Sequence, residues 1–227
     1  MNRANPLIST RSREKLMATP DQILEEHFIN EGVTPSHRDD IRAYLQILKN
    51  RDQKTYEHSI RVGVLAAKIA IFAAKPGISA RMLLWAGLLH DIGKTLIPPG
   101  ILTKTASFTS EDYAAMEPHV KYGWDILANV HDYAAHIIVR HHQFGPHPYP
   151  AELPPLPEHL KDKAEMVQTA ARLLAMADYY DALTTRSNDK NGQKPLTPSQ
   201  RREIYMRDNA DQKELAELLE SVGVLKF

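Results

Sequence analysis

Apolar residues recur at helical spacing along most of the chain. They follow a period of three to four residues in eight segments: 19–28, 36–48, 55–74, 79–93, 109–130, 131–142, 165–185 and 211–223. Thr19 before Pro20 predicts one helix start, and Ser36 with Asp39 three residues later predicts another. No strand-like alternation or internal repeat is visible, so the pattern predicts an all-α fold.

Two stretches interrupt this pattern and predict irregular loops. Six of the fifteen prolines fall within 146–157, and the segment 186–195 is polar and contains a glycine and a proline. We expect one helical bundle over 51–227, preceded by a short helical extension over 1–50. Roughly the first 18 residues of that extension are a candidate for disorder.

Composition narrows the functional classes. A chain of 227 residues with 43% hydrophobic residues can bury one sizeable core. The 28 basic residues balance the 28 acidic ones, so the basic field expected of a protein that binds duplex nucleic acid is missing. No apolar run is long enough to span a membrane. The start has no apolar signal segment and the chain has no cysteine, which favours a cytoplasmic location.

One apolar segment ends in ionisable residues. His90 and Asp91, in GLLHDIGK, close a stretch that is apolar almost all round. Since a buried carboxylate without a partner is costly, both need partners, and a simple His–Asp hydrogen bond is one possibility. A second His–Asp pair, His131–Asp132, lies in a more polar stretch, and we interpret it as a solvated helix start.

Further ionisable residues fall on apolar helix faces, which favours a shared metal site over isolated core residues. His58, His119 and Asp178 each lie three or four residues from apolar positions. His141 and His142 end another helical segment and could serve one metal or two neighbouring ones. Imidazole and carboxylate ligands without thiolate suit iron or manganese, with nickel or zinc as alternatives.

These residues lie in motifs that resemble the HD superfamily of metal-dependent phosphohydrolases, and within it the HD-GYP group of cyclic di-GMP phosphodiesterases. The resemblance covers roughly 55–186. It rests on HSIRV, LLHDIGKTLIPPGILTKTASFTSED, MEPHVKYGWDIL, HHQ, PYP and ADYYDALTT, in that order.

The resemblance implies a helical bundle that holds two divalent metal ions. The implied ligands are His58, His90, Asp91, His119, His141, His142 and Asp178, with Asp91 bridging. Asp181 would then be structural support. One subgroup that holds a third metal has a glutamate at the position of Lys54, so a third metal is not expected here.

The chain departs from the HD-GYP pattern where substrate would bind. Pro148 replaces the glycine of GYP, so the loop follows a different path, although Tyr149 is kept as a substrate contact. His147 in this loop is expected to be exposed. The basic motif after DALTT is altered, which leaves Arg186 and Lys190 as candidate phosphate contacts.

The implied chemistry is hydrolysis of a phosphodiester by a hydroxide that bridges the two metals. Asp91 and Lys94 are the candidate catalytic residues, with Lys94 also placed to neutralise a phosphate oxygen. Arg61 could do the same, or could form a surface pair with Glu57. A cyclic dinucleotide such as cyclic di-GMP is the favoured substrate. The alternatives are an HD phosphohydrolase for another nucleotide or phosphoester, and a non-catalytic module that senses a metal or ligand.

Overall fold

The structure, a computed structural model, describes residues 18–104, 108–185 and 195–227. Two predictions, on the extreme N-terminus and on the loop that follows residue 185, fall mostly on residues outside these ranges. The helices are α1 Pro20–Asn30, α2 Pro35–Arg51, α3 Gln53–Ala73, α4 Ala80–Leu89, α5 Pro99–Leu102, α6 Ser110–Met116, α7 His119–Leu127, α8 Asp132–Ile138, α9 Glu158–Lys161, α10 Ala164–Thr185, α11 Pro198–Asp208 and α12 Lys213–Ser221. The described ranges also contain the 3₁₀ turns η1 Ile92–Leu96 and η3 Ala210–Gln212. No strand occurs in the described ranges, so the all-α prediction is confirmed.

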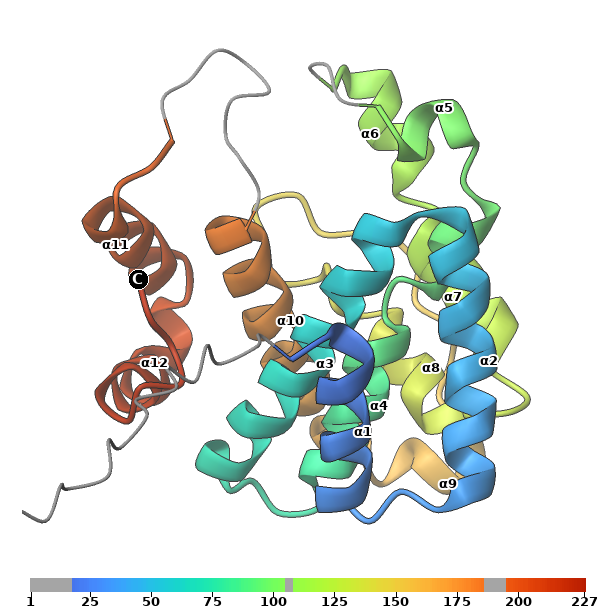
Figure 1. Ribbon diagram of the computed structural model, residues 1–227. Helices are drawn as coiled ribbons and strands as arrows, with labels where there is room; N and C mark the ends of the chain where they lie inside the picture. Colours follow the sequence, from blue (N-terminus) through green and yellow to red (C-terminus); the bar gives the residue numbers. More distant parts are fainter. Residues whose placement is uncertain (1–17, 105–107, 186–194) are drawn as a thin grey trace, which may run out of the picture.

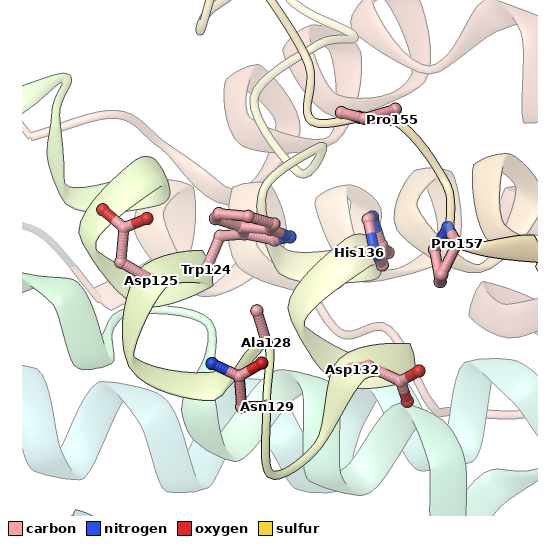
Figure 2. Close-up of a pocket in the computed structure, with 8 residues that line it drawn as sticks. All are labelled: Trp124, Asp125, Ala128, Asn129, Asp132, His136, Pro155 and Pro157. Atoms are coloured by element: carbon pink, nitrogen blue, oxygen red, sulfur yellow. The ribbon is translucent and has the colours of Figure 1, made fainter.

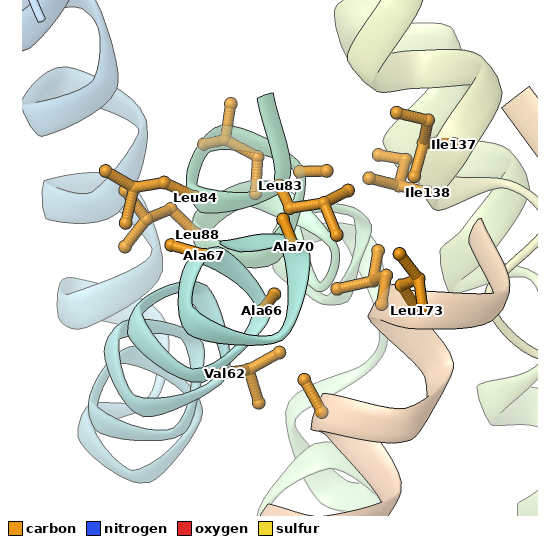
Figure 3. Close-up of a cluster of buried hydrophobic side chains, with 14 of the residues drawn as sticks. Val62, Ala66, Ala67, Ala70, Leu83, Leu84, Leu88, Ile137, Ile138 and Leu173 are labelled. Carbon is orange, nitrogen blue, oxygen red and sulfur yellow. The ribbon is translucent and has the colours of Figure 1, made fainter. Parts of the chain in front are cut away.

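The centre of the bundle is formed by α3, α4, α8 and α10 (Figure 1). Their apolar side chains meet in one cluster, in which Val62 and Ala66 of α3 lie near Leu173 of α10 (Figure 3). α3 and α4 cross closely because glycines face each other: a Cβ on Gly87 would lie 2.6 Å from the Cα of Gly63. This crossing brings the ends of α3 and α4 that carry ionisable residues into the same region.

The N-terminal helices share this core. Leu24 and Phe28 of α1 and Ile41 and Leu45 of α2 are buried in the same apolar cluster as α3 and α4. At the C-terminal end of α2, Arg51 Nη2 donates to Ile97 O at 2.6 Å, just after η1. The division between an extension and a main domain at residue 50 stays a prediction, and helices on both sides of it contribute to one core.

The starts of α1 and α2 were predicted from capping residues, one correctly and one not. Thr19 caps α1 through a capping box with Gln22, and Pro20 is the first helical residue, as predicted. The prediction of Ser36 as a cap was wrong: α2 starts at Pro35, two residues earlier than a cap at Ser36 would give. A proline at the first helical position already sets the backbone, which makes Thr34 the N-cap.

Further differences concern the number of helices, since the short helices α5 and α9 were also not predicted. The segment predicted as one helix over 109–130 is two helices, α6 and α7, because Pro118 interrupts it. α11 was not predicted, although Thr197, Pro198 and Gln200 form a cap and start like those of α1. Segment 146–157 contains no helix, as expected from its prolines. Within the described residues, no helix combines the length and apolar character needed to cross a bilayer.

Candidate metal centre

His58 and Asp178 face each other across the packed pair α3 and α10. His58 lies one turn before Val62 on the inward face of α3, and its side chain is buried. Its Nε2 atom lies 3.1 Å from Asp178 Oδ1. Asp178 is more open to solvent, with 13% of its side chain exposed. One end of the site is therefore a histidine–carboxylate pair, close to where helical spacing placed both residues.

His90 and Asp91 follow the end of α4. The helical segment predicted over 79–93 ends earlier than expected: α4 ends at Leu89, and the chain tightens into η1, which contains Gly93. His90 and Asp91 are both almost fully buried. His90 Nε2 lies 3.4 Å from Asp91 Oδ2 and 3.7 Å from Asp178 Oδ1. Lys94 Nζ donates to Asp91 Oδ2 at 2.5 Å.

Close backbone packing between η1 and α7 positions His119. A Cβ on Gly93 would lie only 1.9 Å from His119 O and 2.5 Å from Gly123 N, so only glycine fits there. This approach brings His119 Nε2 to 3.4 Å from Asp91 Oδ1, the oxygen opposite the one that His90 approaches. Asp91 therefore lies between His90 and His119, as a bridging carboxylate would.

The remaining two histidines come from the chain just after α8. The His141 ring lies 5.1 Å from that of His90 and 5.6 Å from that of His119, measured between centroids. The His142 ring lies 5.3 Å from that of His119. Tyr149 returns from the proline-rich loop and stacks on His142 at 4.4 Å. The side chain of Tyr149 therefore borders the cluster.

All seven predicted ligands thus gather in one place. Their nitrogen and oxygen atoms form three overlapping groups, in each of which the atoms lie within 4.8 Å of one another. The groups are His58, His90 and Asp178; His90, Asp91 and His141; and His119, His141 and His142.

The histidine nitrogens that face the cluster fit a cation. In His90, His119 and His141, the Nδ1 atom contacts a backbone carbonyl oxygen, which can only accept a hydrogen bond. Nδ1 therefore carries the proton, and Nε2 presents a lone pair. Across the described residues, the buried Nε2 atoms of these three histidines and Asp91 Oδ1 have no hydrogen-bond partner. Buried polar atoms are normally satisfied, so this set matches the donor requirements of a metal ion.

The electrostatics of the site favour a neutral His119 and His141 and an ionised Asp91. His58 differs: burial lowers its pKa, but hydrogen bonds to Asp178 and Asp181 raise it above its usual value. Burial, with a further contribution from the charge of Lys94, lowers the pKa of His119 to about 3. Burial and the neighbouring His90 lower the pKa of His141 to about 4. Burial alone would raise the pKa of Asp91, but His90 and Lys94 hold it well below its usual range. For His119, His141 and Asp91, these are the protonation states in which such side chains bind metals.

The side chains around the cluster correct one expectation. Arg61 does not pair with Glu57, which instead accepts from Gln53 Nε2 at 2.8 Å. The guanidinium of Arg61 contacts Asp181, with Nε 2.7 Å from Oδ1. Asp181 in turn contacts His58, which agrees with its interpretation as structural support.

Other predicted residues lie away from the cluster or outside the described ranges. His147 is exposed, as expected, whereas Arg186 and Lys190 belong to the residues that the structure does not describe. Asp132 begins α8 and pairs with His159 at 2.6 Å. It lines a surface cavity with His136 and Trp124, and none of the seven predicted ligands lines this cavity (Figure 2). His131 is half-buried against Trp85, which makes it less solvated than predicted.

The fold and the site together define a class of protein: a helical domain with a buried cluster of histidines and aspartates suited to divalent cations. A sequence profile of the HD domain matches residues 55–183, and the chain belongs to this family. That range includes all seven clustered residues, and it confirms the HD resemblance predicted from the motifs.

Several relatives are similar over most of the chain. It is 29% identical over 195 residues to a cyclic di-GMP phosphodiesterase of Thermotoga maritima. The aligned region covers 82% of this chain and 49% of the relative. It is 30% identical over 161 residues to 3'3'-cGAMP-specific phosphodiesterase 2 of Vibrio cholerae, covering 69% and 28%. A cyclic di-GMP phosphodiesterase of Pseudomonas aeruginosa is 31% identical over 149 residues, covering 64% and 34%. The chain spans about half the length of these relatives or less.

Proposed function

We propose that this protein is a metal-dependent phosphodiesterase that hydrolyses a cyclic dinucleotide of the cyclic di-GMP type. The observation that carries the proposal is the convergence of seven histidine and aspartate side chains whose nitrogen and oxygen atoms face one another, several of them without a hydrogen-bond partner. Support for the substrate class comes from relatives that are named as cyclic di-GMP or cGAMP phosphodiesterases.

The ligand set divides between two cations. His58, His90 and Asp178 would hold one, and His119, His141 and His142 would hold the other, with Asp91 between them. Nitrogen and oxygen donors without sulfur favour iron or manganese, and nickel or zinc are also compatible. When bound, such ions polarise a phosphoryl oxygen and lower the pKa of water.

Protein side chains near the cluster would bind and orient the substrate. Lys94 contacts Asp91 through Nζ and is partly exposed, so its ammonium group can shift toward a phosphate oxygen. Tyr149 presents an aromatic ring at the edge of the cluster, where a base could stack. Arg186 and Lys190 stay predicted contacts for the second phosphate. The cytoplasmic location likewise stays a prediction.

The test is metal analysis of the purified protein, followed by hydrolysis assays on cyclic dinucleotides, nucleotides and a generic phosphodiester. Asp91→Ala should abolish hydrolysis and lower metal content, because the carboxylate between the two cation positions is lost. Asp132→Ala is the matched control, since it alters the other histidine–aspartate pair and should change neither quantity. Equal damage from both variants would contradict the assignment of the site.

The same assays separate the alternatives. Hydrolysis of nucleotides but not of cyclic dinucleotides would favour another HD phosphohydrolase. A protein loaded with two metals that hydrolyses none of these compounds would favour a sensing module.

A further inference from the structure

Four histidines in the cluster are oriented by hydrogen bonds from Nδ1. Three of them donate to backbone carbonyl oxygens, whereas His58 donates to a carboxylate. The three with backbone partners donate to carbonyl oxygens of residues three positions earlier: His90 to Gly87, His119 to Met116, and His141 to Ile138. His58 instead contacts Asp181 Oδ2 at 2.7 Å. An ionised carboxylate is a stronger acceptor than a peptide carbonyl, and it makes the imidazole a more basic ligand.

Asp181 is itself held in place on both oxygens. Arg61 Nε donates to Oδ1 at 2.7 Å and Arg61 Nη2 donates to Oδ2 at 3.0 Å. The hydroxyl of Thr185 lies 3.1 Å from Oδ2, although its shorter contact, at 2.6 Å, is to Asp181 O. Asp181 is buried, while Arg61 is 44% exposed at the surface end of this chain of contacts. Because both oxygens are engaged, the carboxylate cannot rotate away from His58.

The two halves of the cluster also differ in charge. The group of His58, His90 and Asp178 contains a carboxylate, while the charge of Asp181 behind it is balanced by Arg61. The group of His119, His141 and His142 contains only imidazoles. Asp91 contributes to both sides, since Oδ2 faces His90 and Oδ1 faces His119. A divalent cation is held more strongly where more negative charge surrounds it.

We propose that Asp181, oriented by Arg61, is a positioning residue that keeps the proton of His58 on Nδ1 and makes the Asp178 side the tighter of two metal positions. The proposal rests on the proposed function only in requiring that the cluster binds two cations. It predicts ordered loading: the Asp178 side fills first, and the side with three imidazoles fills at higher metal concentration.

Asp181→Asn tests the role of the carboxylate. The introduced amide has one acceptor and one donor group. If its NH₂ faces His58, the imidazole must move its proton to Nε2, which blocks metal binding there. If its NH₂ faces Arg61, two donors oppose each other. In both orientations His58 becomes a weaker ligand.

The measurement is calorimetric titration of the full chain, freed of metal by a chelator, with Mn²⁺. The wild-type protein should bind in two separable steps. Asp181→Asn should weaken the tighter step by about 10- to 100-fold and leave the weaker step nearly unchanged. Asp112→Asn is the matched control, because Asp112 is also buried and paired with a cation, Lys104, but lies outside the cluster. It should leave both steps unchanged.

A second variant separates positioning from a merely structural role. Adding Arg61→Gln to Asp181→Asn removes the opposing guanidinium, so the introduced amide can turn its oxygen to His58 Nδ1. The double variant should therefore bind the first Mn²⁺ more tightly than Asp181→Asn alone. A structural role would make the double variant no better than the single one, and thermal unfolding of each variant shows whether it is folded.

The outcomes distinguish this inference from the proposed function. Two equal steps in the wild type, equal weakening of both steps by Asp181→Asn, or no recovery in the folded double variant would each overturn the inference. Two-step Mn²⁺ binding with the predicted response, but without hydrolysis of any cyclic dinucleotide, would support the inference and refute the proposed function.

Discussion

Gly93→Ala should disturb the site from a position that carries no ligand. A Cβ at this position would lie 1.9 Å from His119 O, whereas ordinary contact begins near 3.4 Å. The neighbouring atoms belong to the backbone of α7 and cannot rotate aside, so η1 and α7 must separate by roughly 1.5 Å. Metal–ligand distances tolerate about 0.2 Å, so His119 would leave the position set by Asp91.

The cost in stability follows from the same clash. Overpacking a well-packed interior typically costs about 1–3 kcal/mol. For a chain of this size, that corresponds to a fall in Tm of roughly 2–12 °C. Gly100→Ala is the matched control, because a Cβ there would meet nothing within 4 Å. It should leave Tm unchanged or slightly raised.

Two assays decide the question. Thermal unfolding without metal measures the packing cost, and Mn²⁺ titration measures the displacement of His119. We expect Gly93→Ala to lower Tm and to weaken the looser binding step, while Gly100→Ala changes neither. A Gly93→Ala protein with the Tm and Mn²⁺ affinity of the wild type would refute the close approach of η1 to α7.

Two other predictions concern pH and substrate. Burial, followed by the charge of His37, lowers the pKa of His131, while Asp40 and Asp132 oppose the shift. Below about pH 6.5, the unfolded chain therefore binds a proton at His131 that the folded protein does not bind. The free energy of unfolding should then fall as the pH drops below that value. His131→Gln should reduce this fall, as measured by urea unfolding of metal-loaded protein at about pH 7.5 and about pH 5.5, and an unchanged pH dependence would contradict the assignment. Arg186→Ala should raise the KM for a cyclic dinucleotide by roughly ten- to a hundredfold and leave hydrolysis of bis(p-nitrophenyl) phosphate nearly unchanged. Equal effects on the two substrates, or none on either, would show that Arg186 does not contact the second phosphate.

Much of the fold was predictable because local signals and apolar periodicity agree along the chain. α3 and α10 each have a continuous apolar face and were predicted nearly to their ends. α11 was missed because Tyr205 is its only buried residue, so it shows no apolar stripe. Its position depends instead on contacts with α10, including the hydrogen bond from Tyr205 to Met176 O. Contacts of this kind, between distant segments, cannot be read from periodicity.

The candidate site was predictable as a set of residues but not as an arrangement. Spacing placed His58 and Asp178 on inward faces, and burial argued that Asp91 needs partners. The partner of Arg61 was not predictable, since Asp181 lies 120 positions away in sequence. The contact of Gly93 with α7 was also hidden, because a glycine after a helix is compatible with many backbone paths.

The adjacent histidines His141 and His142 show why such an arrangement needs the structure. In a regular helix, neighbouring side chains point about 100° apart, so periodicity alone does not show whether both rings face one cluster. α8 has already ended at Ile138, and the chain continues in tighter turns, with His141 N bonded to Ile138 O at 3.3 Å. Here the two rings lie 3.9 Å apart and both approach His119.

The loop that follows then fixes the second ring. Tyr149 stacks on His142, while Gln143 Nε2 donates to Pro150 O at 2.8 Å and ties the loop back to the helix end. Although Pro148 replaces the glycine of GYP, Tyr149 still contacts His142, a predicted metal ligand. A change in this loop therefore moves both His142 and Tyr149, the aromatic ring on which a base could stack. Metal binding by His119, His141 and His142 and the choice of substrate should then change together.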